Sequence, residues 1–276
     1  MKIKYTLLVI MILSFFSCGK EEFEISNLNG NSITLLGHGG MGIHSTYPMN
    51  SYESISKCLN LGMDGTEIDI QLTKDGTLVA FHDEDLSQST SLSGTIFDFT
   101  WDELKNVDYQ YGPYGNYRIL KLNDIFSSMS KLTNYTFFLE CKLTYFGEDA
   151  ICYYELFAER LIEFIERYNL ENNVYIEAKE QWFIITLKEK RPNYKIFIYT
   201  FTTFQNGFEL ANKYNLKGIT ISSKIAKKTD IDFAHANGIM VSLFDLRNRK
   251  DNIEAINKSP DFLETDDVEG ILKLLR

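Results

Sequence analysis

The chain has 276 residues, of which 44% are hydrophobic and 24% are charged, and it contains only four prolines. This composition is typical of a globular protein, and the length suffices for one domain with a large core. The formal charge is −10. It becomes about −12 once Lys2 and Lys4 are removed with residues 1–17, which argues against nucleic acid as a partner and against charge-driven binding to anionic membranes.

The first residues are typical of an export signal. Lys2 and Lys4 precede an apolar run at 5–16, which is shorter than the roughly 20 residues that a membrane-spanning helix needs. The sequence FFSC at 15–18 resembles a loose bacterial lipobox, which predicts a signal peptide over 1–17, a lipidated Cys18 and a tether over 18–32. The chain is then expected in the bacterial cell envelope as an outer-membrane lipoprotein. GKEE at 19–22 resembles the export signal of surface lipoproteins, which suggests exposure at the cell surface. The alternative is a plain secretory signal with an incidental cysteine.

Three further cysteines lie in the mature chain, at Cys58, Cys141 and Cys152. Their odd number and unpaired spacing argue against a disulfide framework and against a zinc site. We expect them to be small core residues.

Strand-like and helix-like runs alternate from residue 33 onward. The run SITLLGHG at 32–39 is followed by the helical pattern at 50–62. The run GTEIDIQLT at 65–73, the turn KDG and the run LVAFHD at 78–83 together predict a hairpin. A polar stretch rich in glycine and tyrosine, at about 87–118, predicts a small insertion after the second strand. Its aromatic side chains are expected to form either the core of that insertion or a lid.

The alternation then continues to the end of the chain. Further strands are predicted at 134–143, 172–178, 194–200, 217–222, 238–246 and 261–266, with helical segments between them, including a long one at 149–169. Eight strand–helix pairs predict a (β/α)8 TIM barrel over 33–276, and an open doubly wound sheet is the alternative.

Carboxylates gather at the predicted carboxyl ends of two strands. Glu67 and Asp69 point to one face of the second strand because side chains alternate, and Glu140 lies near the end of the third. In a barrel these ends meet at one mouth, where three carboxylates form an oxygen-rich site suited to Mg²⁺ or Ca²⁺. The alternative for each residue alone is ordinary: an acidic strand face exposed to solvent.

Two histidines and a lysine occupy neighbouring strand ends. His38 ends the first strand and His82 ends the returning strand of the hairpin, and both suit general acid–base catalysis. Lys142 supplies the positive charge that an anionic substrate needs. Taken singly, the histidines could be structural and Lys142 could pair with Glu140. His235 lies in a helix-like segment, and we interpret it as a buried structural histidine.

Several motifs together resemble the glycerophosphodiester phosphodiesterase family of TIM barrels. They are GHGG at 37–40, PMNS at 48–51, LGMDGTEIDIQLTKDG at 61–76, FHD at 81–83, ECK at 140–142, AHANG at 234–238 and TD at 265–266. The resemblance covers about residues 33–273. It implies that Glu67, Asp69 and Glu140 hold a divalent cation, that His38 and His82 are the catalytic acid and base, and that Lys142 binds the substrate phosphate.

The resemblance has departures that cluster around the phosphate. Gly39 stands where the family usually has arginine, and Met49 stands where a glutamate is common. Gln88 and Phe244 replace a usual arginine and a usual tryptophan. Lys121, Arg118 or His44 are candidates to compensate from loops. We therefore expect retained phosphodiester chemistry in an altered substrate pocket.

The resemblance implies a metal-dependent phosphodiesterase that converts glycerophosphodiester-type substrates to an alcohol and sn-glycerol 3-phosphate. The expected partner is a small-molecule phosphodiester, with the membrane contacted only through the lipid anchor and no protein partner implied. Two alternatives stay open. The same site could act on a lysophospholipid, phosphoinositide or envelope-polymer phosphodiester, or the chain could be a non-catalytic, ligand-binding surface lipoprotein.

Overall fold

The computed structural model describes residues 22–276 except residues 111–113, 146 and 148. The predicted signal peptide at 1–17 and the predicted lipidation site Cys18 lie outside the described residues.

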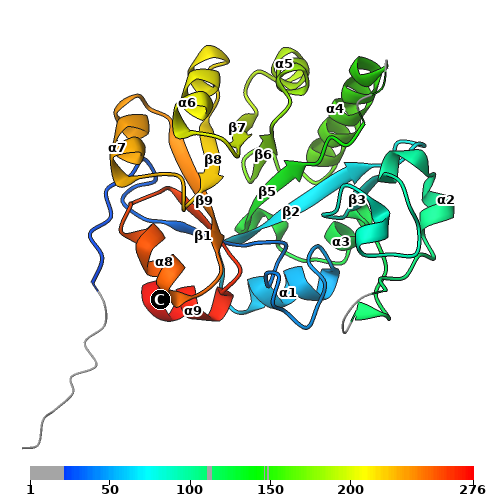
Figure 1. Ribbon diagram of the computed structural model, residues 1–276, viewed down its shortest axis with the longest axis horizontal. Helices are drawn as coiled ribbons and strands as arrows, with labels where there is room; N and C mark the ends of the chain where they lie inside the picture. Colours follow the sequence, from blue (N-terminus) through cyan, green and yellow to red (C-terminus); the bar gives the residue numbers. More distant parts are fainter. Residues whose placement is uncertain (1–21, 111–113, 146, 148) are drawn as a thin grey trace, which may run out of the picture.

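Eight parallel strands close into a barrel that is surrounded by helices (Figure 1). The barrel closes because β1 pairs with both β10 and β2. The predicted (β/α)8 barrel is thereby confirmed, and the open sheet is excluded. The barrel strands are β1 (Thr34–Gly37), β2 (Gly65–Leu72), β5 (Thr136–Cys141), β6 (Val174–Ala178), β7 (Lys195–Thr200), β8 (Gly218–Ser222), β9 (Met240–Leu246) and β10 (Phe262–Thr265).

The helices pack an apolar face against the outside of the barrel. In α4, Tyr153, Phe157 and Leu161 recur at four-residue spacing and are all buried. Cys152 lies on the exposed side of α4, so its expected core position is wrong, whereas Cys58 and Cys141 are buried. Among the described residues, no helix is both long and apolar enough to cross a membrane. The outer helices are α1 (Tyr52–Asn60), α3 (Leu122–Ser127), α4 (Ala150–Arg167), α5 (Gln181–Lys190), α6 (Phe204–Lys213), α7 (Lys228–Ala236), α8 (Arg249–Ile256) and α9 (Val268–Leu275).

The barrel interior is apolar at one end and polar at the other. Strand alternation turns Ile68 and Ile70 outward into the helix-covered core, which leaves Glu67 and Asp69 facing inward. A cluster of inward-facing apolar side chains fills the end nearest the amino termini of the strands. These are Leu36, Phe138, Tyr175, Phe197, Met240 and Phe262.

The connection from β2 to β5 carries an extra lobe. The short strands β3 (Leu78–Ala80) and β4 (Leu120–Lys121) extend the sheet in antiparallel fashion, which confirms the predicted hairpin. Between them lie η1 (Leu86–Gln88), η2 (Ile96–Asp98) and α2 (Trp101–Leu104), in the region of the predicted insertion at 87–118. The lobe has its own small core, against which Phe99 and Trp101 pack. Tyr109 packs against this core as well, and both Tyr109 and Tyr114 line a cavity. A lid formed by the aromatic residues stays a prediction.

Candidate active site

Three carboxylates converge inside the barrel near the carboxyl ends of β2 and β5. Asp69 and Glu140 are direct neighbours in the parallel register, and Glu67 lies two residues before Asp69 on the same face. One oxygen from each of the three lies within 4.8 Å of the others. All three side chains are buried or nearly so.

Backbone and amide donors from the segment after β1 fix two of these carboxylates. The Gly39 amide N–H donates to Glu67 Oε2 at 2.8 Å. Asn50 donates from Nδ2 to Asp69 Oδ2 at 2.8 Å and accepts from the Asp69 amide at 2.9 Å. Asn50 has a left-handed backbone (φ 65°), which this residue type tolerates better than most. No role was assigned to Asn50 from the sequence, although it lies in the PMNS motif.

The cluster carries more negative than positive charge. Lys142 Nζ lies 2.7 Å from Glu140 Oε1 and 3.1 Å from Asp69 Oδ1. Glu67 Oε1 is buried and has no hydrogen-bond partner among the described residues. Burial, together with the charges of Asp69 and Glu140, raises the pKa of Glu67 well above its usual value. A cation bound here would offset this charge and give Glu67 Oε1 a partner.

The residues present fit a hard divalent cation. The donor atoms of the cluster are carboxylate oxygens, which Mg²⁺ and Ca²⁺ prefer, and Glu67 Oε1 is buried without a partner in the described part of the chain. Glu67, Asp69 and Glu140 are therefore the residues that would hold such an ion.

Each of the two predicted histidines is paired with an aspartate. His38 Nδ1 lies 2.8 Å from Asp266 Oδ1, and the two meet because β1 and β10 are paired in register. His82 Nδ1 lies 3.0 Å from Asp83 Oδ1, and Asp83 also accepts a hydrogen bond from Ser89. A carboxylate only accepts, so Nδ1 of each ring donates, which leaves both Nε2 atoms available for chemistry.

The pKa values of both histidines are raised, by their paired aspartates and, for His82, first by Asp69. Burial alone would lower the pKa of His38, but the hydrogen bond and charge of Asp266 outweigh it and raise the pKa to about 9. For His82, the charge of Asp69 is the largest cause of a raised pKa, followed by the hydrogen bond to Asp83. From the sequence, Asp83 and Asp266 are placed only within the motifs FHD and TD. Their role as histidine partners was missed.

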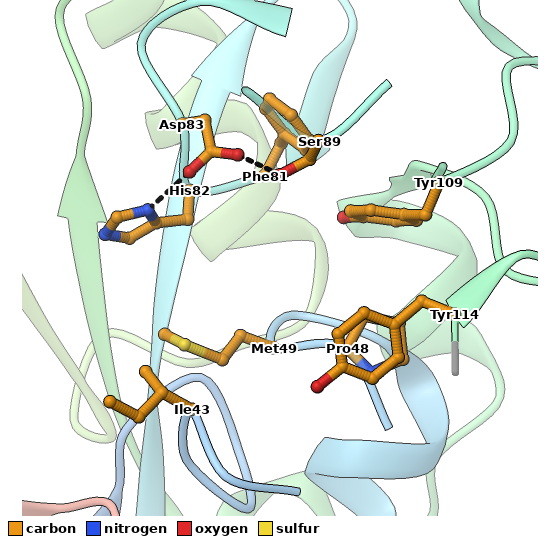
Figure 2. Close-up of a pocket in the computed structure, with 9 residues that line it drawn as sticks. All are labelled: Ile43, Pro48, Met49, Phe81, His82, Asp83, Ser89, Tyr109 and Tyr114. Carbon is orange, nitrogen blue, oxygen red and sulfur yellow. Dashed lines mark hydrogen bonds and ion pairs between the residues drawn. The ribbon is translucent and has the colours of Figure 1, made fainter. Parts of the chain in front are cut away.

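A cavity of about 280 Å³ opens beside His82 (Figure 2). His82, Asp83 and Ser89 form its polar side. Six apolar or aromatic residues line the rest: Ile43, Pro48, Met49, Phe81, Tyr109 and Tyr114.

Comparison with known proteins identifies the family. A family model described as "Glycerophosphoryl diester phosphodiesterase family" matches residues 41–272. The chain belongs to this family. It is therefore a phosphoric diester hydrolase of a metal-dependent family. The matched range contains the three carboxylates, His82 and Lys142, whereas His38 lies just before it.

Members of the family from other organisms align over most of the chain. A glycerophosphodiester phosphodiesterase of Caldanaerobacter subterraneus is 26% identical over 85% of this chain and 95% of its own length. One from Bacillus altitudinis is 24% identical over 84% of this chain and 95% of its own length. Among solved structures, an Oleispira antarctica phosphodiesterase in complex with the product sn-glycerol-3-phosphate superposes with a TM-score of 0.74. It is 19% identical and covers 87% of this chain and 96% of its own.

This family member fills the space beside Gly39 with Met49. A Cβ atom added at Gly39 would lie 2.7 Å from Met49 Cβ, and Gly39 also has a left-handed backbone (φ 54°). A larger residue at position 39 is therefore excluded unless Met49 moves. Met49 thus takes up the room that a side chain at position 39 would need.

The suggested compensating cations are engaged elsewhere. Arg118 Nε lies 2.7 Å from Asp108 Oδ1, and Lys121 Nζ lies over the Trp101 ring at 5.0 Å. Neither residue lines the cavity beside His82, and neither does His44. His235 pairs with Asp261 at 2.9 Å, at the opposite end of β10 from Asp266, as expected of a structural residue.

Proposed function

We propose that this protein is a divalent-metal-dependent phosphodiesterase that hydrolyses glycerophosphodiester-type substrates to an alcohol and sn-glycerol 3-phosphate. The observation that carries the proposal is the three-carboxylate cluster, in which Glu67 Oε1 is buried without a hydrogen-bond partner among the described residues, beside two histidines that aspartates hold through Nδ1. Family membership supports the reaction class, and the product named for the Oleispira structure supports the substrate class.

The proposed roles follow from position. Glu67, Asp69 and Glu140 hold the cation, which when bound would polarise a phosphoryl oxygen as a Lewis acid. Lys142, at the edge of the cluster, contributes positive charge toward the substrate phosphate.

The two histidines differ in what keeps them protonated. His38 owes its raised pKa mainly to Asp266, which lies outside the carboxylate cluster. His82 owes its raised pKa first to Asp69, a member of the cluster. Neutralising Asp69 therefore lowers the pKa of His82 more than that of His38. We assign His38 as the proton donor to the leaving alcohol and His82 as the base that activates the attacking oxygen.

Phosphorus NMR of the chain from residue 19 onward tests this proposal. With glycerophosphoethanolamine or glycerophosphoglycerol, monoester signals are expected with Mg²⁺ or Ca²⁺ and not with EDTA. His38→Ala and His82→Ala should each lower kcat by about 10²-fold or more, the usual scale of general acid–base catalysis. His44→Ala is the matched control, because His44 is exposed in the loop after β1. Undiminished turnover in both single variants would contradict the assignment.

We also propose that Cys18 carries a lipid anchor in the bacterial envelope. Residues that follow it pack at the amino-terminal end of β10: Asn27 Nδ2 donates to the Pro260 carbonyl and the Leu28 amide donates to Asp261 Oδ1. This end is opposite the carboxylate cluster, which favours substrates that arrive from the surrounding medium. A Cys18→Ser chain should lose membrane fractionation, and unchanged fractionation would count against the anchor.

A further inference from the structure

We propose that the cavity beside His82 binds an apolar substituent of the phosphodiester, and that Met49 is a specificity-determining residue for this preference. The inference rests on the proposed function and deepens it by naming the class of substrate. The apolar group can belong to the leaving alcohol or to an acyl chain on the glycerol, and the experiment below separates these two sources.

Most of the cavity wall is apolar or aromatic. Ile43 and Met49 face His82 across the cavity, and Phe81 and Tyr109 extend the apolar lining toward the inserted lobe (Figure 2). His82 Nδ1 and Ser89 are engaged with Asp83, which accepts from both, so His82 Nε2 and the Tyr109 hydroxyl are the groups that remain able to form hydrogen bonds here. The Tyr114 hydroxyl donates to the Ser45 carbonyl at 2.8 Å. A polyol would therefore find few partners here for its hydroxyl groups.

The apolar wall adjoins the residues that hold the carboxylate cluster and the partner of His38. Met49 contacts the position of Gly39, whose amide holds Glu67, and it immediately precedes Asn50, which holds Asp69. The Ile43 amide donates to Asp266 Oδ1 at 3.1 Å, so Ile43 is tied to the partner of His38. A group bound against Met49 and Ile43 thus lies beside the residues that hold the carboxylate cluster and the partner of His38.

The size of the cavity suits a small apolar group. An apolar cavity of about 150 Å³ accommodates benzene, so about 280 Å³ has room for a short alkyl chain or an aromatic ring. A hydrophobic pocket disfavours an isostere that carries an added hydroxyl group by about 10²-fold in kcat/KM. We therefore expect a preference of at least about 10-fold for a butyl group over a glyceryl group of similar size.

The experiment compares kcat/KM in two arms that keep the charge of the substrate constant. In the first, glycerophosphobutanol is compared with glycerophosphoglycerol, so that only the leaving alcohol changes. In the second, glycerophosphoethanolamine that carries a butanoyl group on its glycerol is compared with unacylated glycerophosphoethanolamine, so that the leaving alcohol stays the same. A kcat/KM about 10-fold or more higher for the butyl diester in the first arm assigns the cavity to the leaving alcohol. The same increase for the acylated diester in the second arm assigns the cavity to an acyl chain.

Variants of the cavity wall test the role of Met49. Met49→Gln keeps the length of the side chain and should lower the kcat/KM ratio of the apolar to the polar substrate by about 10-fold. Met49→Leu should retain that ratio. Ile43→Gln tests the same wall in a side chain that is 38% exposed, should Met49→Gln fail to fold. Ile151→Gln, on the exposed side of α4 and away from the cavity, is the matched control and should leave the ratio unchanged.

The outcomes separate this inference from the proposed function. Metal-dependent turnover with ratios near one in both arms would overturn the apolar subsite and leave the phosphodiesterase proposal intact. If no diester is hydrolysed, the proposed function fails, and the dissociation constants of the corresponding phosphonates decide the subsite. Tighter binding of the butyl phosphonate would then support the subsite, and equal binding would overturn it.

Discussion

At the scale of single residues, the site depends on side chains that hold other side chains. Asp266 fixes His38 and Asn50 fixes Asp69, and each partner lies far away in the sequence or on a different element. Such contacts set the ring orientation and the charge that a catalytic group has before substrate arrives. Because Asp266 raises the pKa of His38, it also links the stability of the folded chain to pH.

Replacing Asp266 by asparagine should therefore flatten the pH dependence of stability in the metal-free chain. The folded-state pKa of His38 is about 9, above its ordinary 6.5. The His38–Asp266 pair stabilises the folded chain by about 3 kcal/mol below pH 6.5. This stabilisation is lost as the pH rises through 9. Thermal melts in EDTA between pH 6 and 10 check this. Asp232→Asn, in an exposed ion pair, is the control, and equal slopes for wild type and Asp266→Asn would contradict the prediction.

At the scale of elements, β6 and β10 add two further carboxylates to the barrel interior. Glu264 Oε1 lies 2.5 Å from Ser242 Oγ, and Glu177 is hydrogen-bonded to Thr220. Burial is the main reason that the pKa of Glu264 rises to about 7, and burial also raises the pKa of Glu177. These strands therefore fold most favourably when a proton is retained.

Glu264→Gln should stabilise the metal-free chain at pH 8 by about 3 kcal/mol, because it removes a buried charge and keeps a polar partner for Ser242. Because the pKa of Glu264 rises from its ordinary 4.5 to about 7, the folded wild type loses stability as the pH rises from about 4.5 to about 7. The variant should lose less stability over that pH range. Denaturant unfolding at pH 4.5 and 8 measures the difference. Glu254→Gln, exposed on α8, is the control, and a variant less stable at pH 8 would refute the idea.

The elements were largely predictable, whereas several contacts that complete the site were not. Alternation in 65–73 predicted that Glu67 and Asp69 share a face, and the KDG turn predicted the hairpin that brings back His82. Pairing of His38 with Asp266 joins residues at opposite ends of the chain, so no local pattern reveals it. The same limit applies to Gly39 and Met49, whose mutual exclusion depends on a left-handed turn.

At the scale of the whole molecule, the fold concentrates negative charge at its centre. Glu67, Asp69, Glu140, Glu177 and Glu264 are all buried in the barrel interior. Among the lysine and arginine residues that the structure describes, Lys142 is the only one that forms an ion pair with any of these five carboxylates. Bringing these groups together without a cation opposes folding through repulsion and lost hydration. Cation binding and global stability should therefore be coupled.

Mg²⁺ or Ca²⁺ should raise the melting temperature of the EDTA-treated chain, because the unfolded chain has no assembled site. At a free cation concentration of 100 times Kd, the stabilisation is expected to be about 2.7 kcal/mol. Glu67→Gln should remove most of this shift, since it neutralises the residue with the unpartnered oxygen, whereas Glu254→Gln should keep it. Calorimetric scans with and without each cation measure the effect. A melting temperature that no divalent cation changes would refute the metal site, even if the barrel and its histidines were otherwise intact.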